Sequence, residues 1–163
     1  MLSSEKFLSV VNMTQIVSID LIVKNNKGQI LLGKRKNSPA KGFYFVPGGR
    51  LFKNETIKEG SQRIVSWELG VSDSDIRPKP RCVSEHIYSD NFADAKDVEN
   101  KVISTHYVCF GFDLDLDEYD ESTFKEQHMD AIWIYPEEIL ERDDVHEYVK
   151  LYFTPDAYNR FES

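Results

Sequence analysis

Cysteine, long apolar runs and net positive charge are scarce in this sequence, and each scarcity excludes a class of protein. The two cysteines, Cys82 and Cys109, each lie in an apolar, strand-like run, which favours separate buried thiols over a disulfide or metal pair. No run of about 18 apolar residues occurs, so no membrane span is expected. The start, MLSSEKFLSVVNMTQ, lacks a basic segment and a long apolar core, which argues against a signal peptide. The expected location is therefore cytoplasmic.

The balance of charge limits the expected partners. There are 20 basic and 28 acidic residues, and the net charge is −8. A nucleic-acid groove needs a basic surface, so nucleic acid is not an expected partner. An acidic protein can still bind a phosphate ester where a few basic side chains and a divalent metal gather. The length fits one globular domain, residues 1–163.

Apolar alternation and turn residues predict a hairpin followed by a third strand. Two β-rich runs, IVSIDLIV and QILLGKRK, flank Asn25-Asn26-Lys27-Gly28, which is typical of a hairpin turn. The short run FYFV ends at Pro47. The pair Gly48-Gly49 after it predicts a tight turn with close approach of the backbone.

A helix is expected after this turn. Thr56 and Glu59 have the spacing of a capping box, and Gly70 is a stop signal. Glu68 comes late in the helix, with Ile64 one turn earlier on the same face. The residues expected on the buried side are Ile57, Ile64, Val65, Trp67 and Leu69.

Further strands and helices complete the expected order β-β-β-α-β-β-β-α. Strands are predicted in RPKPRCVSEHIYSD, VISTHYVCFGFDLDLD and AIWIY, separated by the polar loops NFADAKDVENK and EYDESTFKEQHMD. Pro136 opens a helix, a last helix begins near Asp143 or Asp144, and the tail after Pro155 frays. This order predicts a mixed α/β architecture whose helices cover a largely antiparallel sheet.

The stretch from Gly49 to Val71 carries the strongest chemical signal. It resembles a Nudix box: Gly, five residues, Glu, seven residues, then Arg-Glu-apolar-any-Glu-Glu-any-Gly-apolar. The spacing is kept, but Ile64 and Trp67 replace two glutamates and leave Glu68. This replacement is similar to one branch, the GDP-mannose mannosyl hydrolases. The runs LLGKRKNSPAKGFYFVPGGR, HIYSDNF, THYVCFGF and EQHMD resemble the same branch in the same order.

The resemblance, over residues 7–153, implies a fold and a reaction. The implied fold is α/β, the Nudix fold: a mixed, mostly antiparallel sheet flanked by helices in an α/β/α sandwich. The implied substrate is a small-molecule nucleotide sugar, GDP-mannose or GDP-glucose, which is hydrolysed to GDP and free sugar. Water would attack the anomeric carbon with inversion, assisted by one Mg²⁺ per site, or by Mn²⁺. A homodimer is implied as well.

The resemblance also implies the metal ligands and the base. Gly48 would supply a carbonyl, Glu68 a carboxylate and Gln127 an amide oxygen to the metal. His128 would be the general base, because an ordinary imidazole pKa of ~6.5 leaves a neutral fraction at cytoplasmic pH. Neighbouring residues of a regular strand point to opposite faces, so EQHMD should be irregular if Gln127 and His128 serve one site.

Substrate contacts are implied in the same way. Arg35 and Arg50 would hold the diphosphate, since a guanidinium can bind phosphate oxygens in a bidentate manner. Tyr107 would donate to a phosphate or leaving oxygen. Asp20, inside an apolar strand, faces solvent or a functional cleft, and would hold the sugar or orient a neighbouring cation. These four residues would act in binding and in catalysis.

Other residues have a structural interpretation beside the functional one. His86 and Tyr88 either line the sugar pocket or pack in the core. Glu55, Glu59 and Arg63 belong to the box, but we expect them to support the helix and its loop, with Glu59 and Arg63 paired at i,i+4 spacing.

Two rival functions stay open at this point. An ordinary Nudix diphosphatase, which cleaves a P–O bond and releases GMP and a sugar phosphate, would share the fold and the metal. A nucleotide-sugar-binding module without catalysis would also have a box with replaced glutamates. The first rival differs from the mannosyl hydrolase in the bond that it cleaves. The second differs from both enzymes because it has no turnover.

Overall fold

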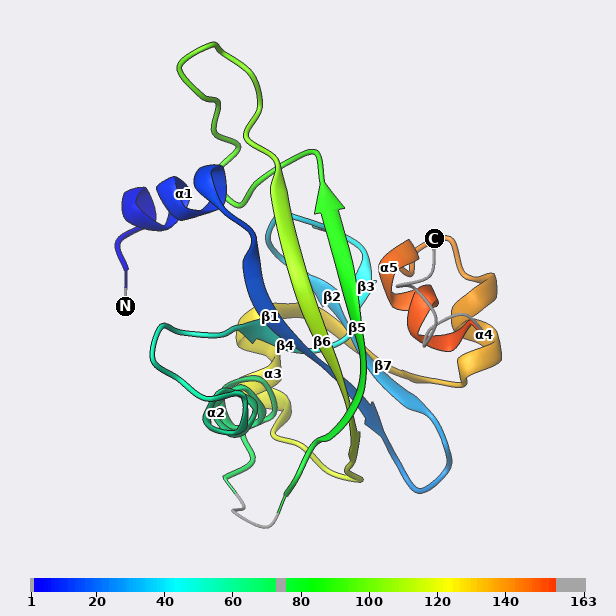
Figure 1. Cartoon of the computed structure of the whole chain (residues 1–163). Helices are drawn as coiled ribbons and strands as arrows, with labels where there is room; N and C mark the ends of the chain where they lie inside the picture. Colours follow the sequence, from blue (N-terminus) through cyan, green and yellow to red (C-terminus); the bar gives the residue numbers. More distant parts are fainter. Residues whose placement is uncertain (1, 73–75, 155–163) are drawn as a thin grey trace.

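A mixed sheet lies between two layers of helices in the computed structural model, which describes residues 2–72 and 76–154 (Figure 1). The strands in these ranges are β1 (Ile16–Lys24), β2 (Ile30–Arg35), β3 (Tyr44–Phe45), β4 (Gly48–Arg50), β5 (Lys79–Tyr88), β6 (Thr105–Asp115) and β7 (His128–Ile134). The helices are α1 (Ser4–Met13), α2 (Ile57–Leu69), α3 (Glu121–Gln127), α4 (Pro136–Glu141), α5 (Glu147–Lys150) and the 3₁₀ turn η1 (Leu151–Phe153).

The strand pairing confirms a mixed, mostly antiparallel sheet. The order is β3-β2-β1-β6-β5, with β4 paired to β1 and β7 paired to β2. Only β1 and β6 run parallel among the strand pairs of the described residues, while the other pairs are antiparallel. The hairpin of β1 and β2 is confirmed, and Gly28 adopts a positive φ of 81° in its turn, a conformation that glycine adopts readily.

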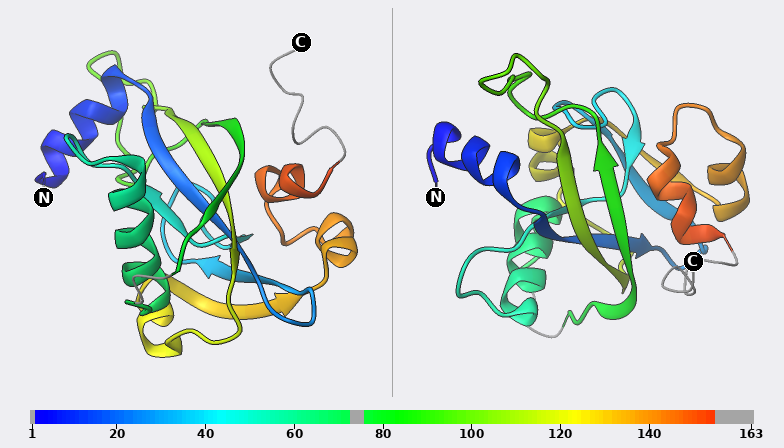
Figure 2. Two further views of the ribbon diagram at one scale, coloured as in Figure 1. Left: turned by 60° about the horizontal axis from the view of Figure 1, so that its bottom comes forward. Right: turned by 45° about the horizontal axis from the view of Figure 1, so that its top comes forward.

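A hydrophobic core lies on each face of the sheet. On one face, Leu21 of β1 and Leu31 of β2 pack with Ile64 of α2 and Phe124 of α3. On the opposite face, alternate strand residues such as Ile22 belong to a second core built with α4, α5 and η1. Figure 2 shows the two helical layers from two further directions. The α/β/α sandwich is therefore confirmed.

Helix α2 confirms the predicted caps and corrects the predicted buried face. Thr56 and Glu59 form the capping box, and Gly70 ends the helix with a left-handed φ of 67°. Ile64, Val65 and Leu69 are buried, as expected. The prediction was wrong for Ile57 and Trp67, which are 43% and 50% exposed. The contacts of Trp67 explain its place: its ring packs on Phe52 and Arg63 at the surface of the helix rather than on the sheet.

Several predicted boundaries were also wrong. Helix α1 was not anticipated, and the supposed loop EYDESTFKEQHMD contains the helix α3. Gly48 and Gly49 do not form a tight turn but lie in β4, although the predicted close backbone approach is present. A Cβ atom at Gly48 would lie 2.5 Å from the carbonyl oxygen of Ile19 on β1. The last helix begins at Glu147, later than expected, and the predicted fraying after Pro155 falls outside the described residues.

The predicted pairing of Glu59 with Arg63 is replaced by another ion pair. Arg63 donates to both carboxylate oxygens of Glu55, at 2.6 and 2.7 Å, and to the backbone oxygen of Arg50. Glu59 accepts instead from the backbone N–H of Thr56 at the helix start. These residues do support the helix and its loop, as expected. None of the helices in the described ranges is long and apolar enough to cross a membrane.

Candidate active site

The predicted site residues line two adjoining cavities. One, of about 260 Å³, lies over β1, β5 and β6 and is called here the substrate cavity. The other, of about 140 Å³, lies between β2, α2 and the start of β7 and is called the base cavity. Arg35, Val46 and Gly48 line both, so the two cavities share a wall.

The base cavity gathers the residues expected to bind metal and to activate water. Glu68 from α2, Gln127 from the end of α3 and His128 from the start of β7 line it with Gly48. Carboxylate, amide and carbonyl oxygens are the donors that Mg²⁺ prefers, so this set fits the cation. Glu68 is the one carboxylate among the described residues that line the cavity.

The chain is irregular where Gln127 and His128 meet, as the sequence requires if both serve one site. Gln127 ends α3 and His128 begins β7, so their side chains do not follow strand alternation. The ring of His128 is buried and stacks on Phe124 with centroids 4.1 Å apart. Its Nε2 atom lies 3.2 Å from Oε2 of Glu68, whereas Nδ1 is buried without a partner among the described residues. Nε2 is therefore the nitrogen that can serve the cavity.

Two arginines border the substrate cavity, and both are oriented by neighbours. Arg35 donates from Nε to the carbonyl oxygen of Pro39 at 2.8 Å. Arg50 lies between the rings of Phe7 and Phe52, each 4.6 Å from its guanidinium carbon. Stacked rings cover the faces of a guanidinium and leave its in-plane N–H groups for anions. Desolvation and the nearby Arg63 lower the pKa of Arg50.

Asp20 lies in a buried hydrogen-bond network on the floor of the substrate cavity. Tyr152 donates its hydroxyl proton to Asp20 at 2.6 Å. Burial raises the pKa of Asp20 to about 6, against the opposing effects of the Tyr152 hydrogen bond and the Arg35 charge. The side chain thus faces a cavity rather than bulk solvent, and its role toward a sugar or a cation stays a prediction. Its partner Tyr152 lies 132 residues away along the chain.

His86, Tyr88 and Tyr107 line the same cavity, and they also pack against one another or their neighbours. The ring of His86 stacks on Tyr148 with centroids 4.4 Å apart. Tyr88 lies edge-on to Tyr107, and burial raises the pKa of both phenols. His86 and Tyr88 therefore line a cavity and pack against neighbouring rings at the same time, while their contact with a sugar stays a prediction.

Sequence reasoning missed several cavity residues. Phe7 and Phe92 line the substrate cavity with their tilted rings 5.1 Å apart, and Cys109 also lines it. The apolar spacing of Phe7, Leu8 and Val11 after a capping Ser3 could have revealed α1. No sequence signal could have placed Cys109 next to His86.

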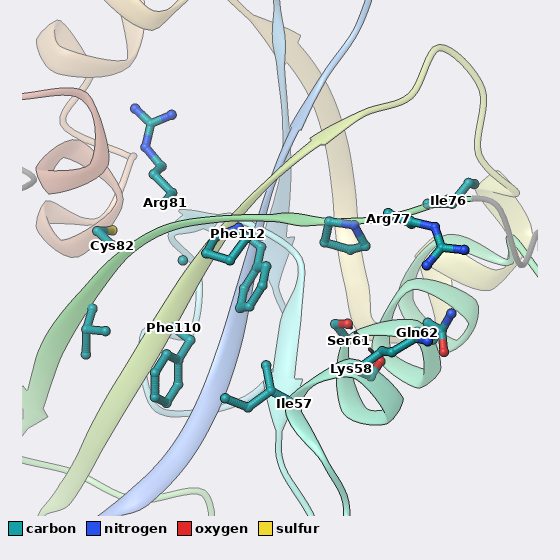
Figure 3. A pocket seen from close by; sticks show the side chains of 14 residues that line it. Ile57, Lys58, Ser61, Gln62, Ile76, Arg77, Arg81, Cys82, Phe110 and Phe112 are labelled. Carbon is teal, nitrogen blue, oxygen red and sulfur yellow. Dashed lines mark hydrogen bonds between the residues drawn. The ribbon is translucent and has the colours of Figure 1, made fainter.

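A larger groove of about 690 Å³ runs beside α2 and holds none of the predicted site residues (Figure 3). Phe110 and Phe112 of β6 line it together with Ile57 of α2. Because side chains alternate along β6, these rings point to the sheet face opposite Tyr107 and Cys109. Among the described residues, the groove also shares no lining residue with either site cavity.

Comparison with known proteins identifies the family. Residues 14–154 match the sequence model of the family described as NUDIX domain. The low-salt glycan biosynthesis protein Agl8 of Haloferax volcanii is 38% identical over 125 residues, which are 76% of this chain and 73% of that protein. The ADP-ribose pyrophosphatase of Methanocaldococcus jannaschii is 45% identical over 56 residues, which are 34% of this chain and 32% of that protein.

Solved structures agree on the fold. The MutT protein of Methanosarcina mazei Go1 superposes with a TM-score of 0.64 at 21% identity, over 91% of this chain and 96% of that one. At this identity the likeness shows the fold alone. The family match over most of the chain, together with the described box helix and sheet, shows that this protein is a member of the Nudix domain family of hydrolases.

Proposed function

We propose that this protein hydrolyses GDP-mannose, or GDP-glucose, to GDP and free sugar by attack of water at the anomeric carbon. The observation that carries the proposal is the contact of His128 with Glu68 in the base cavity, where Glu68 is the single carboxylate among the described lining residues. An imidazole can act there as the general base, and one carboxylate remains for a metal. The relative named for glycan biosynthesis supports a sugar-linked substrate.

In the proposed reaction, the base and the attacking water lie on one side of the anomeric carbon, and the leaving diphosphate lies on the other. A water molecule in the base cavity gives a proton to Nε2 of His128 as its oxygen bonds to the anomeric carbon. The bond from that carbon to the diphosphate oxygen breaks, and its electron pair leaves with GDP. Nε2 is 3.2 Å from the carboxylate of Glu68, and a cation bound at Glu68 would release it from this contact so that it can take the proton.

The leaving diphosphate needs charge stabilisation rather than a proton donor. Arg35 and Arg50 line the substrate cavity and can bind its phosphate oxygens with paired N–H groups. A divalent cation held by Gly48, Glu68 and Gln127 would add positive charge at the same leaving group. Because Arg35 and Gly48 border both cavities, the diphosphate would lie at their shared wall.

One Mg²⁺ per site is part of the proposal, with Mn²⁺ as a substitute. Ile64 is buried in the core beneath α2, and Trp67 packs on Phe52 and Arg63, so neither position of the box offers a further ligand. Equilibrium binding of Mg²⁺ in the presence of GDP should give one ion per chain. A homodimer, implied by the resemblance, is tested by light scattering during size exclusion.

The decisive experiment follows the oxygen of water. GDP-mannose is turned over with Mg²⁺ in ¹⁸O-labelled water, and the products are analysed by mass spectrometry. The proposal predicts label in mannose and unlabelled GDP. Label in a phosphate, with GMP as a product, would instead establish a diphosphatase, a function favoured by the partial similarity to an ADP-ribose pyrophosphatase. Turnover no higher than in a chelator control would indicate a binding module without catalysis.

A further inference from the structure

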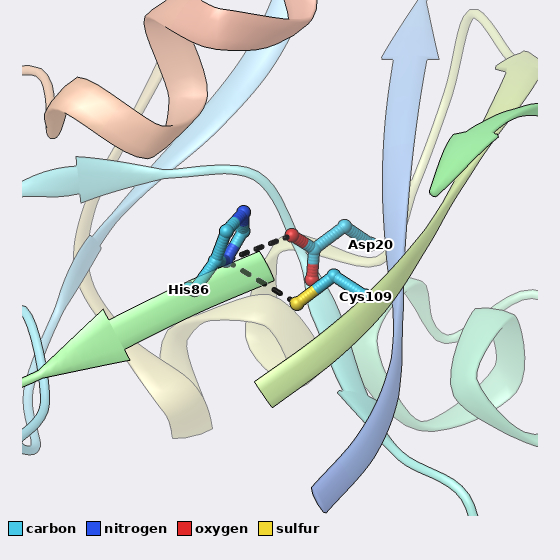
Figure 4. Close-up of side chains that lie close together, drawn as sticks. All are labelled: Asp20, His86 and Cys109. Carbon is cyan, nitrogen blue, oxygen red and sulfur yellow. Dashed lines mark hydrogen bonds and ion pairs between the residues drawn. The ribbon is translucent and has the colours of Figure 1, made fainter. Parts of the chain in front are cut away.

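Three side chains with different donor atoms meet on the floor of the substrate cavity (Figure 4). They are Asp20 of β1, Cys109 of β6 and His86 of β5, on three neighbouring strands of the sheet. Nδ1 of His86 lies 3.2 Å from Sγ of Cys109 and 4.0 Å from Oδ2 of Asp20. All three donor atoms lie within 4.8 Å of one another.

These separations suit a small metal ion at the centre of the cluster. Zinc binds sulfur at ~2.3 Å and nitrogen or oxygen at ~2.0 Å, so neighbouring donors of a tetrahedral site lie about 3.5 Å apart. The observed distances of 3.2 and 4.0 Å lie on either side of that value. Small side-chain adjustments would therefore bring the three donors into a coordination sphere.

We propose that Asp20, His86 and Cys109 form a binding site for a soft divalent transition metal such as Zn²⁺. The donor set of thiolate, imidazole and carboxylate selects such a metal over Mg²⁺, which prefers oxygen alone. The site differs in donor type and position from the oxygen donors Gly48, Glu68 and Gln127 of the base cavity. All three ligands line the substrate cavity, from which a fourth ligand would reach the ion.

Each ligand already has an orienting partner behind it. Tyr152 donates to Asp20 at 2.6 Å, and Ser18 donates to Sγ of Cys109 at 3.0 Å. Nε2 of His86 lies 3.2 Å from Oγ of Ser84, which can accept a hydrogen bond from Nε2–H when Nδ1 binds metal. Partners of this kind hold ligands in place at natural metal sites.

The charges of the cluster also favour a divalent ion. Asp20, His86 and Cys109 are 6%, 2% and 2% exposed, so an unbalanced charge there would be costly. A carboxylate and a thiolate balance a divalent cation and leave the site neutral. Binding breaks the S–H bond of Cys109 and releases its proton to solvent. Burial raises the pKa of this thiol, so the metal itself must displace the proton.

A metal ion at this site would lie in the cavity where the proposed function places the substrate. Asp20 and His86 line the substrate cavity, and the resemblance implies that they contact the sugar, so Zn²⁺ should inhibit by competing with substrate. This consequence rests on the proposed function, whereas metal binding itself does not.

Cobalt provides a test that needs no substrate and no activity. Co²⁺ is titrated into the protein without Mg²⁺, and thiolate-to-cobalt charge-transfer absorption is followed in the near ultraviolet. We expect one equivalent to produce this band and Zn²⁺ to abolish it. Cys109→Ser should lose the band, and His86→Gln should weaken cobalt binding at least 10-fold.

Cys82→Ser is the matched control, because Cys82 lies on β5 outside the three-residue cluster and should retain the full band. Thermal melts establish that each variant is folded. A wild-type protein without a thiolate band, or a band that survives Cys109→Ser, would overturn the site. A wild-type protein that shows the thiolate-to-cobalt band but does not hydrolyse GDP-mannose would overturn only the proposed function.

Discussion

Nε2 of His128 and Oε2 of Glu68 lie 3.2 Å apart, although the two residues are separated by 60 positions in the sequence. This contact joins the start of β7 to the end of the box helix α2. Since the same carboxylate is assigned to a metal, cation binding at Glu68 would free Nε2 of His128 for a water molecule. The proposed base and the proposed metal ligand are thus neighbours in the base cavity.

His128→Gln should lower turnover of GDP-mannose by about 10²- to 10⁴-fold, because the amide cannot take a proton from water. The dissociation constant of GDP, measured by calorimetry, should change little. His106→Gln is the control, since His106 pairs with Glu85 away from both cavities. Unchanged turnover in His128→Gln would move the base elsewhere, with Glu126 and Asp130 next in line.

Gly33→Ala should displace the imidazole of His128. A Cβ atom at position 33 would lie 2.3 Å from Nδ1 of His128, closer than two unbonded atoms can approach. We expect a loss of turnover and a loss of about 1–3 kcal/mol in the free energy of unfolding, as is usual for overpacked sites. Urea unfolding of a double-mutant cycle with His128→Ala checks the cause. An equal cost of Gly33→Ala in both backgrounds would refute the clash.

Asp20→Asn should flatten the pH dependence of stability. The folded protein holds the Asp20 proton more tightly than the unfolded chain, because burial raises the pKa from 3.8 to about 6. This contribution to stability is complete below pH ~4 and is lost as pH rises through ~6. Since one pKa unit corresponds to ~1.4 kcal/mol, the Asp20 proton contributes about 3 kcal/mol to the free energy of unfolding at low pH.

Urea unfolding between pH 4 and 8 provides the measurement for Asp20. Relative to wild type, Asp20→Asn should gain stability as the pH rises through ~6. Tyr152→Phe removes a hydrogen bond that favours the ionised carboxylate, so it should move the loss of stability to higher pH. Parallel pH profiles for wild type and Asp20→Asn would contradict the raised pKa.

Phe7→Leu and Phe52→Leu should each raise KM for the nucleotide sugar about 2- to 5-fold, with kcat less affected. Each change removes one ring from the face of Arg50, a contact usually worth ~0.5–1 kcal/mol. Phe153→Leu is the matched control, because Phe153 packs on Arg81 at 5.7 Å and lines neither site cavity. An equal or larger effect from Phe153→Leu than from Phe52→Leu would refute the orienting role.

The sequence predicted those parts of the fold that depend on local chemistry. Turn residues at Asn25–Gly28, the capping box of Thr56 and Glu59, and Pro136 each act within a few residues, and the structure has all three features. Helix α3 was not predicted because Phe124 is its only buried residue, so its sequence has no apolar period. Trp67 was misplaced because its partners Phe52 and Arg63 lie on the outer side of α2.

The motif predicted the residues of the candidate site, but it did not predict the hydrogen bonds that hold Asp20 and Cys109. Glu68, Gln127 and His128 were chosen from box spacing and flanking residues, and the structure brings them to one cavity. The hydrogen bonds of Tyr152 to Asp20 and of Ser18 to Cys109 join positions 132 and 91 residues apart. Such contacts arise from strand register and helix packing, which no local pattern records.

The two cavities share a wall, but most of their other lining residues come from separate parts of the chain. The substrate cavity is built largely on β1, β5 and β6, whereas the proposed metal ligand Gln127 ends α3. If α3 moved away while the sheet stayed intact, Gln127 would leave the base cavity, but His128 would stay because β7 pairs with β2 in the sheet. Metal binding at the proposed site would therefore depend on α3, whereas the residues proposed to hold the nucleotide sugar would not.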